Sequence, residues 1–439
     1  MKAKSIIIVF LACFYAMLIS CSRNLHQHAV AKLFDQSLVL NDHFTGFALY
    51  DMDQQKMIYE QNDDQYFTPA SNTKLFTFYT CLRLLGDSIP ALNYIVNNDS
   101  LIFWGTGDPS FLHSELKAVK GYNFLKNAHQ KLFFSAGFRQ SDFYGSGWAW
   151  NDYNDDYQVE ITEFPLEDNL AHFSVSAKGT LQVSPAPLSM FLRPDATFKP
   201  AQFGIERNLT DNTFVYPAAS VPAKFSQEIP LKTSTGLTLA LLTDTLRKPV
   251  YETHLPLPLY FKTIYDANAD TVYRHMLQPS DNFMAEQLLL VCSSVKFNVL
   301  NTDSVIQYSK THFLNDLPDA PQWVDGSGLS RYNLFTPRSI VKLLCKISEQ
   351  IKNDSLLHSL LPIGGLAGTI RHAYKTDNGI PFVWAKTGSL ANNHNQSGYL
   401  ITRKGRRLAF SFMNNNFTRP QREIRDEMVR IITYLHDNY

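Results

Sequence analysis

Three short polar motifs, spread along 439 residues, constrain the fold of this chain more than any other feature. S-N-T-K, from Ser71 to Lys74, follows a predicted β-hairpin and precedes an apolar run that is typical of a helix. S-D-N, beginning at Ser280, opens a second apolar helix, and K-T-G, beginning at Lys386, lies in an apolar run of strand type. We therefore expect an α+β domain whose elements come from both ends of the chain.

The first motif alone is weak evidence for chemistry. Residues i and i+3 of a helix share one face, so Ser71 and Lys74 could meet. A purely structural interpretation makes Ser71 a helix cap and Lys74 a solvated residue of the first turn. A capping box prefers Glu or Gln at the third position, however, and a cation there opposes the helix dipole. S-x-x-K also begins at Ser114, Ser293 and Ser339.

The combination of motifs is more specific than its members. K-T-G occurs once, and S-x-N recurs only at Ser22, although Ser280 taken alone could simply cap its helix. The set S-x-x-K, S-x-N, K-T-G is known from penicillin-binding proteins and class A β-lactamases. The chain resembles the D-alanyl-D-alanine carboxypeptidases and endopeptidases of the penicillin-binding protein 4 type, peptidase family S13. G-T-G-D-P-S-F near 105, G-S-G-W-A-W-N-D-Y near 145 and D-G-S-G-L-S-R-Y-N from Asp325 extend the resemblance.

The resemblance implies an α+β fold of the penicillin-binding protein and serine β-lactamase type. Such a domain has an antiparallel sheet with flanking helices and a helical subdomain. We expect it to comprise residues 22–85 and 270–439. Residues 86–269 contain short alternating stretches, turns and prolines, which predict a β-rich insertion. Compared with the family that the chain resembles, this insertion is shorter than in the better-known members.

Local patterns place several elements. Hairpins are expected within residues 45–60 and 397–413, and helices near 282–295 and 337–352. The last twenty residues carry an apolar stripe at helical spacing. This stripe could bind a membrane, but packing against a sheet is the commoner reason for such a pattern.

A serine hydroxyl is a poor nucleophile at neutral pH and requires a nearby base. Lys74 could serve Ser71 if its pKa is lowered by burial and by a second cation, Lys386. By resemblance, Ser280 would relay a proton to the leaving amine and Asn282 would orient the substrate. A serine acyl-enzyme would form and then hydrolyse, without a metal or an organic cofactor.

Recognition of the substrate carboxylate is assigned to the third motif. Lys386, Thr387, Gly388 and Ser389 provide positive charge and hydroxyls suited to a terminal carboxylate. By resemblance, the backbone N–H groups of Ser71 and Ser389 would form the oxyanion hole. The expected partners are peptidoglycan peptides, with β-lactam antibiotics as covalent inhibitors.

The N-terminus predicts export. M-K-A-K precedes a short apolar core that ends in L-I-S-C, which resembles the lipobox of bacterial lipoproteins. Residues 1–21 would then be a signal with Cys21 as the lipidated residue, anchoring a periplasmic protein to a membrane. The alternative is an ordinary secretory signal in which Cys21 is incidental.

Of the remaining cysteines, Cys81, Cys292 and Cys345 lie in apolar stretches. We expect them to be buried and to pack as small hydrophobic residues, with at least one of them unpaired.

Charge and spacing limit other functions. Lys plus Arg equals Asp plus Glu, 40 against 40, so the net charge creates no electrostatic field that would favour binding to nucleic acid or to an anionic membrane.

A serine β-lactamase is one alternative function, but Glu167–Leu170 matches the E-x-x-L-N segment of class A enzymes only in part. The 209 positions between Ser71 and Ser280 also exceed the class A gap. The second alternative, a non-catalytic peptidoglycan-binding lipoprotein, would normally have lost one of the motifs.

Overall fold

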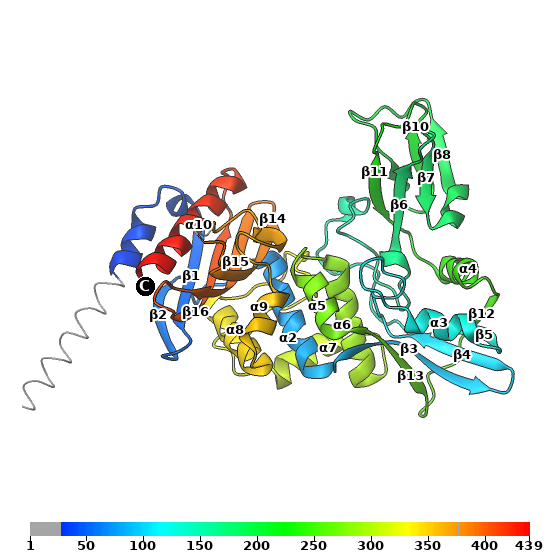
Figure 1. Ribbon diagram of the computed structural model, residues 1–439, viewed down its shortest axis with the longest axis horizontal. Helices are drawn as coiled ribbons and strands as arrows, with labels where there is room; N and C mark the ends of the chain where they lie inside the picture. Colours follow the sequence, from blue (N-terminus) through cyan, green and yellow to red (C-terminus); the bar gives the residue numbers. More distant parts are fainter. Residues whose placement is uncertain (1–27, 376–377) are drawn as a thin grey trace, which may run out of the picture. The chain divides into compact units, whose positions relative to one another are not determined.

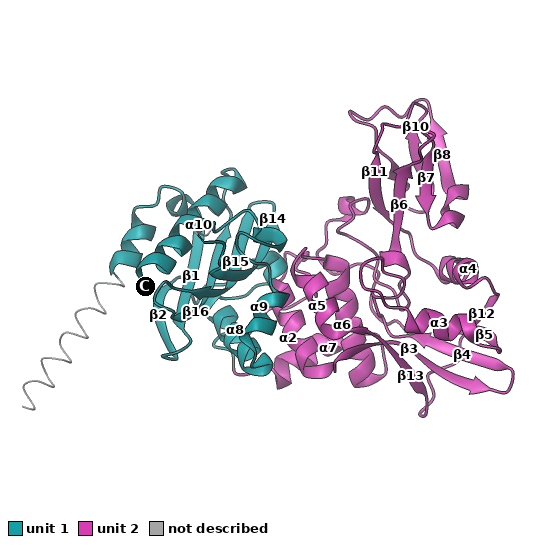
Figure 2. Cartoon of the chain, viewed as in Figure 1, with its two compact units in different colours: residues 1–72, 317–321, 334–439 teal, residues 73–316, 322–333 magenta. Residues whose placement is uncertain are grey.

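The computed structural model describes residues 28–375 and 378–439, which form two compact units (Figure 2). Among these described residues, unit 1 comprises 28–72, 317–321, 334–375 and 378–439, and unit 2 comprises 73–316 and 322–333. The predicted signal and Cys21 lie outside the described residues. The interruption of a catalytic domain by an insertion at 86–269 stays a prediction.

Unit 1 is built around a five-stranded antiparallel sheet of order β14-β15-β16-β1-β2 (Figure 1). Its register pairs Phe47 with Phe412 and Lys386 with Ser397. Both predicted hairpins are confirmed. The strands are β1 (Phe44–Asp51), β2 (Lys56–Gln61), β14 (Val383–Leu390), β15 (Asn393–Ile401) and β16 (Arg407–Asn415).

The terminal helix α10 (Gln421–Asn438) packs on this sheet together with the helix of residues 28–35. Phe34, Phe47 and Phe412 share one buried core with the predicted stripe, which comprises Ile424, Met428, Ile431, Ile432 and Leu435. The stripe is therefore a packing surface, as its spacing indicates. Within the described residues, no helix combines the length and the apolar character needed to cross a bilayer.

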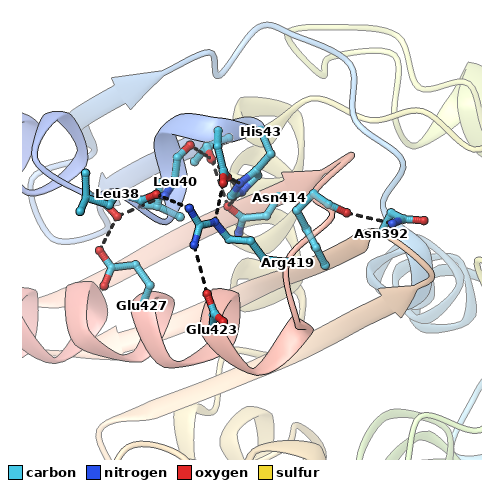
Figure 3. A network of polar contacts seen from close by, with 12 residues as sticks. Leu38, Leu40, His43, Asn392, Asn414, Arg419, Glu423 and Glu427 are labelled. Carbon is cyan, nitrogen blue, oxygen red and sulfur yellow. Dashed lines mark hydrogen bonds and ion pairs between the residues drawn. The ribbon is translucent and has the colours of Figure 1, made fainter.

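A network of polar contacts holds the N-terminal end of α10 in place (Figure 3). The Arg419 guanidinium bonds to Asp42, donates to the Leu38 carbonyl at 2.9 Å and lies 3.1 Å from Glu423. His43 Nε2 lies 3.0 Å from Asn414 Oδ1 at the end of β16. These bonds hold the segment before β1 against the start of α10.

The other elements of unit 1 surround the sheet. The predicted helix near 337–352 is confirmed as α8 (Pro337–Ile351), which contacts β1, β15 and β16. Tyr399 on β15 donates to the α8 carbonyl of Leu344 at 2.8 Å. The short elements are η1 (Leu40–Asp42), η2 (Ala70–Thr73), α9 (Asp354–Leu360) and η6 (Gly368–Ile370).

Unit 2 contains a group of packed helices, α2 (Lys74–Leu84), α5 (Ala269–Leu277), α6 (Asn282–Phe297) and α7 (Thr302–His312). Every residue of α6 from Phe283 to Ser294 is buried, which explains why apolar residues occur on all sides of this helix. The predicted helix near 282–295 is thus confirmed, and it lies in the interior of unit 2.

The remainder of unit 2 is rich in strands, in line with the pattern of residues 86–269. A mixed sheet has the order β12-β5-β4-β3-β13, and two three-stranded sheets have the orders β8-β10-β9 and β11-β6-β7. The elements of the first sheet are β3 (Ser88–Asn97), β4 (Ser100–Gly105), β5 (Lys131–Ser135), β12 (Val250–Thr253) and β13 (Lys262–Asn268), accompanied by α3 (Lys120–Asn127) and α4 (Thr235–Leu246). The others are β6 (Leu170–Val175), β7 (Leu181–Ser184), β8 (Leu192–Asp195), β9 (Glu206–Arg207), β10 (Phe214–Pro217) and β11 (Ser226–Pro230), with η3 (Trp150–Asp152), η4 (Glu167–Asn169) and η5 (Ala186–Phe191).

Candidate active site

Ser71 lies in η2, at the end of the first segment of unit 1. The preceding Ala70 has a φ of +47°, a left-handed conformation that is costly for a residue with a Cβ and is often found at functional sites. The K-T-G glycine lies against this segment. A Cβ on Gly388 would be 2.9 Å from the Ser71 nitrogen and 2.4 Å from the Pro69 carbonyl oxygen. Only glycine leaves room for the serine segment beside β14.

Side chains of the sheet anchor the serine segment. The Thr68 N–H donates to Asn415 Oδ1 at 2.7 Å, and Asn395 Nδ2 donates to the Thr68 carbonyl at 2.9 Å. Asn72 Nδ2 donates to Ser397 Oγ at 2.9 Å. These bonds from β15 and β16 hold the segment that carries Ser71 in place.

The third motif lies in the middle of the buried strand β14. Lys386 is fully buried and its Nζ donates to the Thr387 carbonyl at 2.8 Å. Thr387 Oγ1 donates to Thr369 Oγ1 at 2.7 Å, and Ser389 Oγ lies 2.8 Å from His394 Nδ1. Burial lowers the pKa of His394 to about 4, so this imidazole is neutral at pH 7. Thr387 and Ser389 line a cavity of about 740 Å³ within unit 1.

Lys74 begins α2 in unit 2 and is fully buried. Its Nζ donates to Asn282 Oδ1 at 2.6 Å and to the Ser327 carbonyl at 2.8 Å. Burial lowers the pKa of Lys74 to about 8. The negative charges of nearby carboxylates raise this pKa, and Asp281 has the largest effect among them. A side chain with such a pKa can release and accept a proton near neutral pH. The contribution expected of Lys386 stays a prediction.

The second motif begins α6 in the same unit. Ser280 has a φ of +72° and does not cap the helix, because Asp281 takes that position and accepts from the Met284 N–H at 2.7 Å. Asn282 Nδ2 donates to the Tyr157 carbonyl at 3.0 Å while its Oδ1 accepts from Lys74. Ser280 and Asn282 line a cavity of about 390 Å³. α2 differs from α6, because the side chain at its cap position, Thr73, makes no capping hydrogen bond.

The structure therefore groups the predicted site residues within each unit. Ser71, Lys386, Thr387, Gly388 and Ser389 belong to unit 1. Lys74, Ser280 and Asn282 belong to unit 2. Ser71 and Lys74 are joined by the uninterrupted helical run of η2 and α2, residues 70–84.

Sequence reasoning missed the role of the D-G-S-G-L-S-R-Y-N segment and of a buried acid beneath it. Glu286 accepts from the Gly326 N–H at 2.9 Å and from the Ser327 N–H at 2.7 Å. Asp325 accepts from the Gly328 N–H at 2.9 Å. Together they shape the turn that presents the Ser327 carbonyl to Lys74. The signal was available, since Glu286 is the one acid in the apolar core of α6.

Burial raises the pKa of Glu286 to about 8, with the charge of Asp325 acting in the same direction. Among residues 28–375 and 378–439, no group of three or more His, Cys, Asp and Glu side chains is placed to hold a metal ion.

An α+β fold with S-x-x-K at a helix start, S-x-N at a second helix and K-T-G on a strand defines the penicillin-binding class of serine hydrolases. The chain belongs to the D-Ala-D-Ala carboxypeptidase 3 (S13) family, whose sequence profile matches residues 26–195 and 268–435. It is 24% identical to the D-alanyl-D-alanine carboxypeptidase DacB of Haemophilus influenzae, over 90% of each chain. It is 21% identical to the penicillin-sensitive carboxypeptidase A of Dictyostelium discoideum, over 86% of this chain and 83% of that one.

Solved structures with a similar fold come from the same group of proteins. The crystal structure of penicillin binding protein 4 (dacB) from Haemophilus influenzae matches with a TM-score of 0.70 and 21% identity. The match covers 92% of this chain and 98% of that one. A structure of the same protein complexed with a β-lactam matches with a TM-score of 0.66 and 20% identity, over the same shares. The chain is thus a hydrolase of the D-Ala-D-Ala carboxypeptidase family. The family resemblance and the α+β fold class predicted from the sequence are both confirmed.

Proposed function

We propose that this protein is a periplasmic D-Ala-D-Ala carboxypeptidase and endopeptidase that cleaves peptidoglycan stem peptides through an acyl-enzyme on Ser71. One observation carries the proposal. Lys74 is a fully buried lysine with a pKa of about 8, in the helical run that carries Ser71. A serine nucleophile needs such a base, and lysines acquire this role when burial lowers their pKa.

The proposed reaction has two stages. In the first, Ser71 Oγ attacks the carbonyl carbon between the two D-alanines while Lys74 Nζ takes the hydroxyl proton. The backbone N–H groups of Ser71 and Ser389 stabilise the oxyanion, and loss of one such donor typically costs about 3 kcal/mol. The C–N bond then breaks, and the leaving amine receives a proton by way of Ser280. In the second stage, water hydrolyses the Ser71 ester and restores the free hydroxyl.

Substrate recognition is assigned to residues of the second and third motifs. Lys386, with the hydroxyls of Thr387 and Ser389, would bind the terminal carboxylate by charge-assisted hydrogen bonds. Asn282 holds Lys74 through its oxygen and would orient the peptide through its amide.

β-Lactams provide the test, because a penicillin offers a strained amide and a carboxylate in an arrangement similar to acyl-D-Ala-D-Ala. Haemophilus influenzae penicillin binding protein 4, a structural relative, has been solved with a β-lactam. We expect intact-protein mass spectrometry to show one penicilloyl adduct, mapped to the peptide that contains Ser71. Ser71→Ala should abolish the adduct. The control is Ser220→Ala, which removes an exposed serine outside the cavities described above and should leave the adduct unchanged.

Each outcome of this experiment is informative. An adduct that survives in Ser71→Ala overturns the assignment of the nucleophile. Rapid penicillin turnover without an adduct would favour a β-lactamase, and no reaction would favour a non-catalytic binding protein. Mass analysis of muropeptides released from purified peptidoglycan then separates carboxypeptidase from endopeptidase products.

Export and lipidation complete the proposal. The apolar N-terminal stretch that ends in L-I-S-C supports a leader and a lipid on Cys21, outside the described residues. A substrate in the cell wall requires an enzyme outside the cytoplasm, so the leader and the family agree in this respect.

A further inference from the structure

Two cysteines from distant parts of the chain meet in the core of unit 2. Cys81 lies in α2 and Cys292 lies in α6, and these two helices pack against each other. Their Sγ atoms are 3.6 Å apart, and both side chains have no exposed surface. The sequence predicts buried small hydrophobic residues here, and burial is confirmed. The sequence does not predict that the two thiols face each other.

The position of the pair connects it with the candidate active site. α2 begins at Lys74 and α6 begins at Asn282, the two residues joined by the 2.6 Å hydrogen bond. A bond between Cys81 and Cys292 would therefore fasten together the two helices that present the base and its amide partner. The third described cysteine, Cys345, belongs to α8 in unit 1 and is only partly buried, so the predicted full burial is not confirmed for this residue.

We propose that Cys81 and Cys292 form a structural disulfide when the chain folds in the presence of a disulfide oxidant. An S–S bond of about 2.05 Å requires the sulfur atoms to approach by roughly 1.5 Å, which side-chain rotation and small helix shifts supply. The two thiols lose their protons as the bond forms. The oxidant, a small-molecule or protein disulfide, is reduced to two thiols, so that electrons and protons balance.

The burial of the pair determines when the bond forms. Neither sulfur is accessible in the folded protein, and burial together with the neighbouring Cys81 raises the pKa of the Cys292 thiol well above its ordinary range. Thiol–disulfide exchange proceeds through the thiolate and requires access. The disulfide must therefore form during folding, before α2 and α6 close over it, and it resists reductant afterwards.

Peptide mapping tests the proposal without reference to activity. The purified protein is unfolded in denaturant with reductant, then refolded by dilution into reduced and oxidised glutathione. The refolded protein is then unfolded in denaturant without reductant, so that iodoacetamide reaches and blocks every free thiol, and it is digested with trypsin without reduction. We expect one linked species that joins L-F-T-F-Y-T-C-L-R (residues 75–83) to the peptide of residues 275–296. Carbamidomethylation of both Cys81 and Cys292 in the refolded protein overturns the proposal, as does a link from either one to Cys345.

Two variants make the result specific. Cys345→Ser should keep the linked species, because that thiol is not a partner. Cys292→Ala should remove it. The oxidised parent should also melt several degrees above the parent refolded with reductant, since a cross-link closing a long loop restricts the unfolded chain. Cys292→Ala should show no such difference between the two conditions, and equal melting of the oxidised and reduced parent counts against a structural disulfide.

Discussion

The Nζ of Lys74 lies 2.6 Å from Oδ1 of Asn282, and these two residues are the first residues of α2 and α6. A cation at a helix N-terminus is disfavoured by the helix dipole, and a fully buried one also loses its hydration. The amide oxygen of Asn282 and the Ser327 carbonyl compensate in part by accepting hydrogen bonds. The resulting pKa of about 8 gives Lys74 a proton that it can exchange under physiological conditions.

The rate of Ser71 acylation should depend on pH through Lys74. A lysine must be neutral to act as a base, so the rate with a penicillin should rise with pH and level off above about 8. Quenched-flow mass spectrometry of the adduct gives the rate at each pH. Asn282→Asp places a carboxylate beside the ammonium and should move the midpoint to higher pH. A rate that is flat from pH 6 to 10 in the parent would exclude Lys74 as the base.

Gly388→Ala should impair acylation by displacing the serine segment. The new Cβ would lie 2.4 Å from the Pro69 carbonyl oxygen and 2.9 Å from the Ser71 nitrogen, closer than atoms can pack. We expect at least a tenfold loss in the acylation rate, measured with a fluorescent penicillin. Gly236→Ala is the matched control, because a Cβ at that site in α4 meets nothing within 4 Å. Equal rates in both variants would show that β14 does not position Ser71.

Lys386→Ala should reduce kcat/KM for an acyl-D-Ala-D-Ala peptide by at least tenfold, since a charge-assisted hydrogen bond contributes about 1.5–3 kcal/mol. Release of D-alanine is the measurement, and circular dichroism verifies that the variant is folded. Lys404→Ala, at the exposed turn between β15 and β16, removes an equal charge and should retain activity. Normal turnover by folded Lys386→Ala would remove this residue from the site.

Glu286→Ala should destabilise the protein by about 2–5 kcal/mol, because two buried N–H groups, of Gly326 and Ser327, would lose their acceptor. The expected observation is a lower midpoint of urea unfolding. Glu349→Ala, at an exposed position of α8, is the control and should unfold like the parent. If the two variants unfold alike, the Glu286 carboxyl group does not stabilise the turn of Gly326 and Ser327.

Cys21→Ala should release the protein from membranes into the soluble periplasmic extract. One acyl chain binds a bilayer only marginally and several hold firmly, so loss of the proposed lipidation site should have a large effect. Fractionation followed by immunoblotting measures the distribution, with Ser22→Ala as a neighbouring control. A Cys21→Ala protein that stays in the membrane fraction would contradict the lipobox interpretation.

Local periodicity allowed much of the fold to be predicted from the sequence. Alternation identified the hairpins β1–β2 and β15–β16, and helical spacing identified the packed face of α10. These patterns depend on neighbours a few residues apart, which any sequence displays directly. The candidate residues of the three motifs were found in the same way, because each motif is a short contiguous string.

The partners of those residues were decided by tertiary structure. Lys74 bonds to Asn282 and Ser327, which follow it by 208 and 253 positions, and Asn72 bonds to Ser397, 325 positions away. The contact between the thiols of Cys81 and Cys292 is likewise a long-range one, between residues 211 positions apart in the sequence. The sequence alone determined which chemical groups this protein carries and which local elements hold them. Only the packed chain decided which groups are desolvated and paired, because burial and long-range contacts depend on how those elements close around a common core.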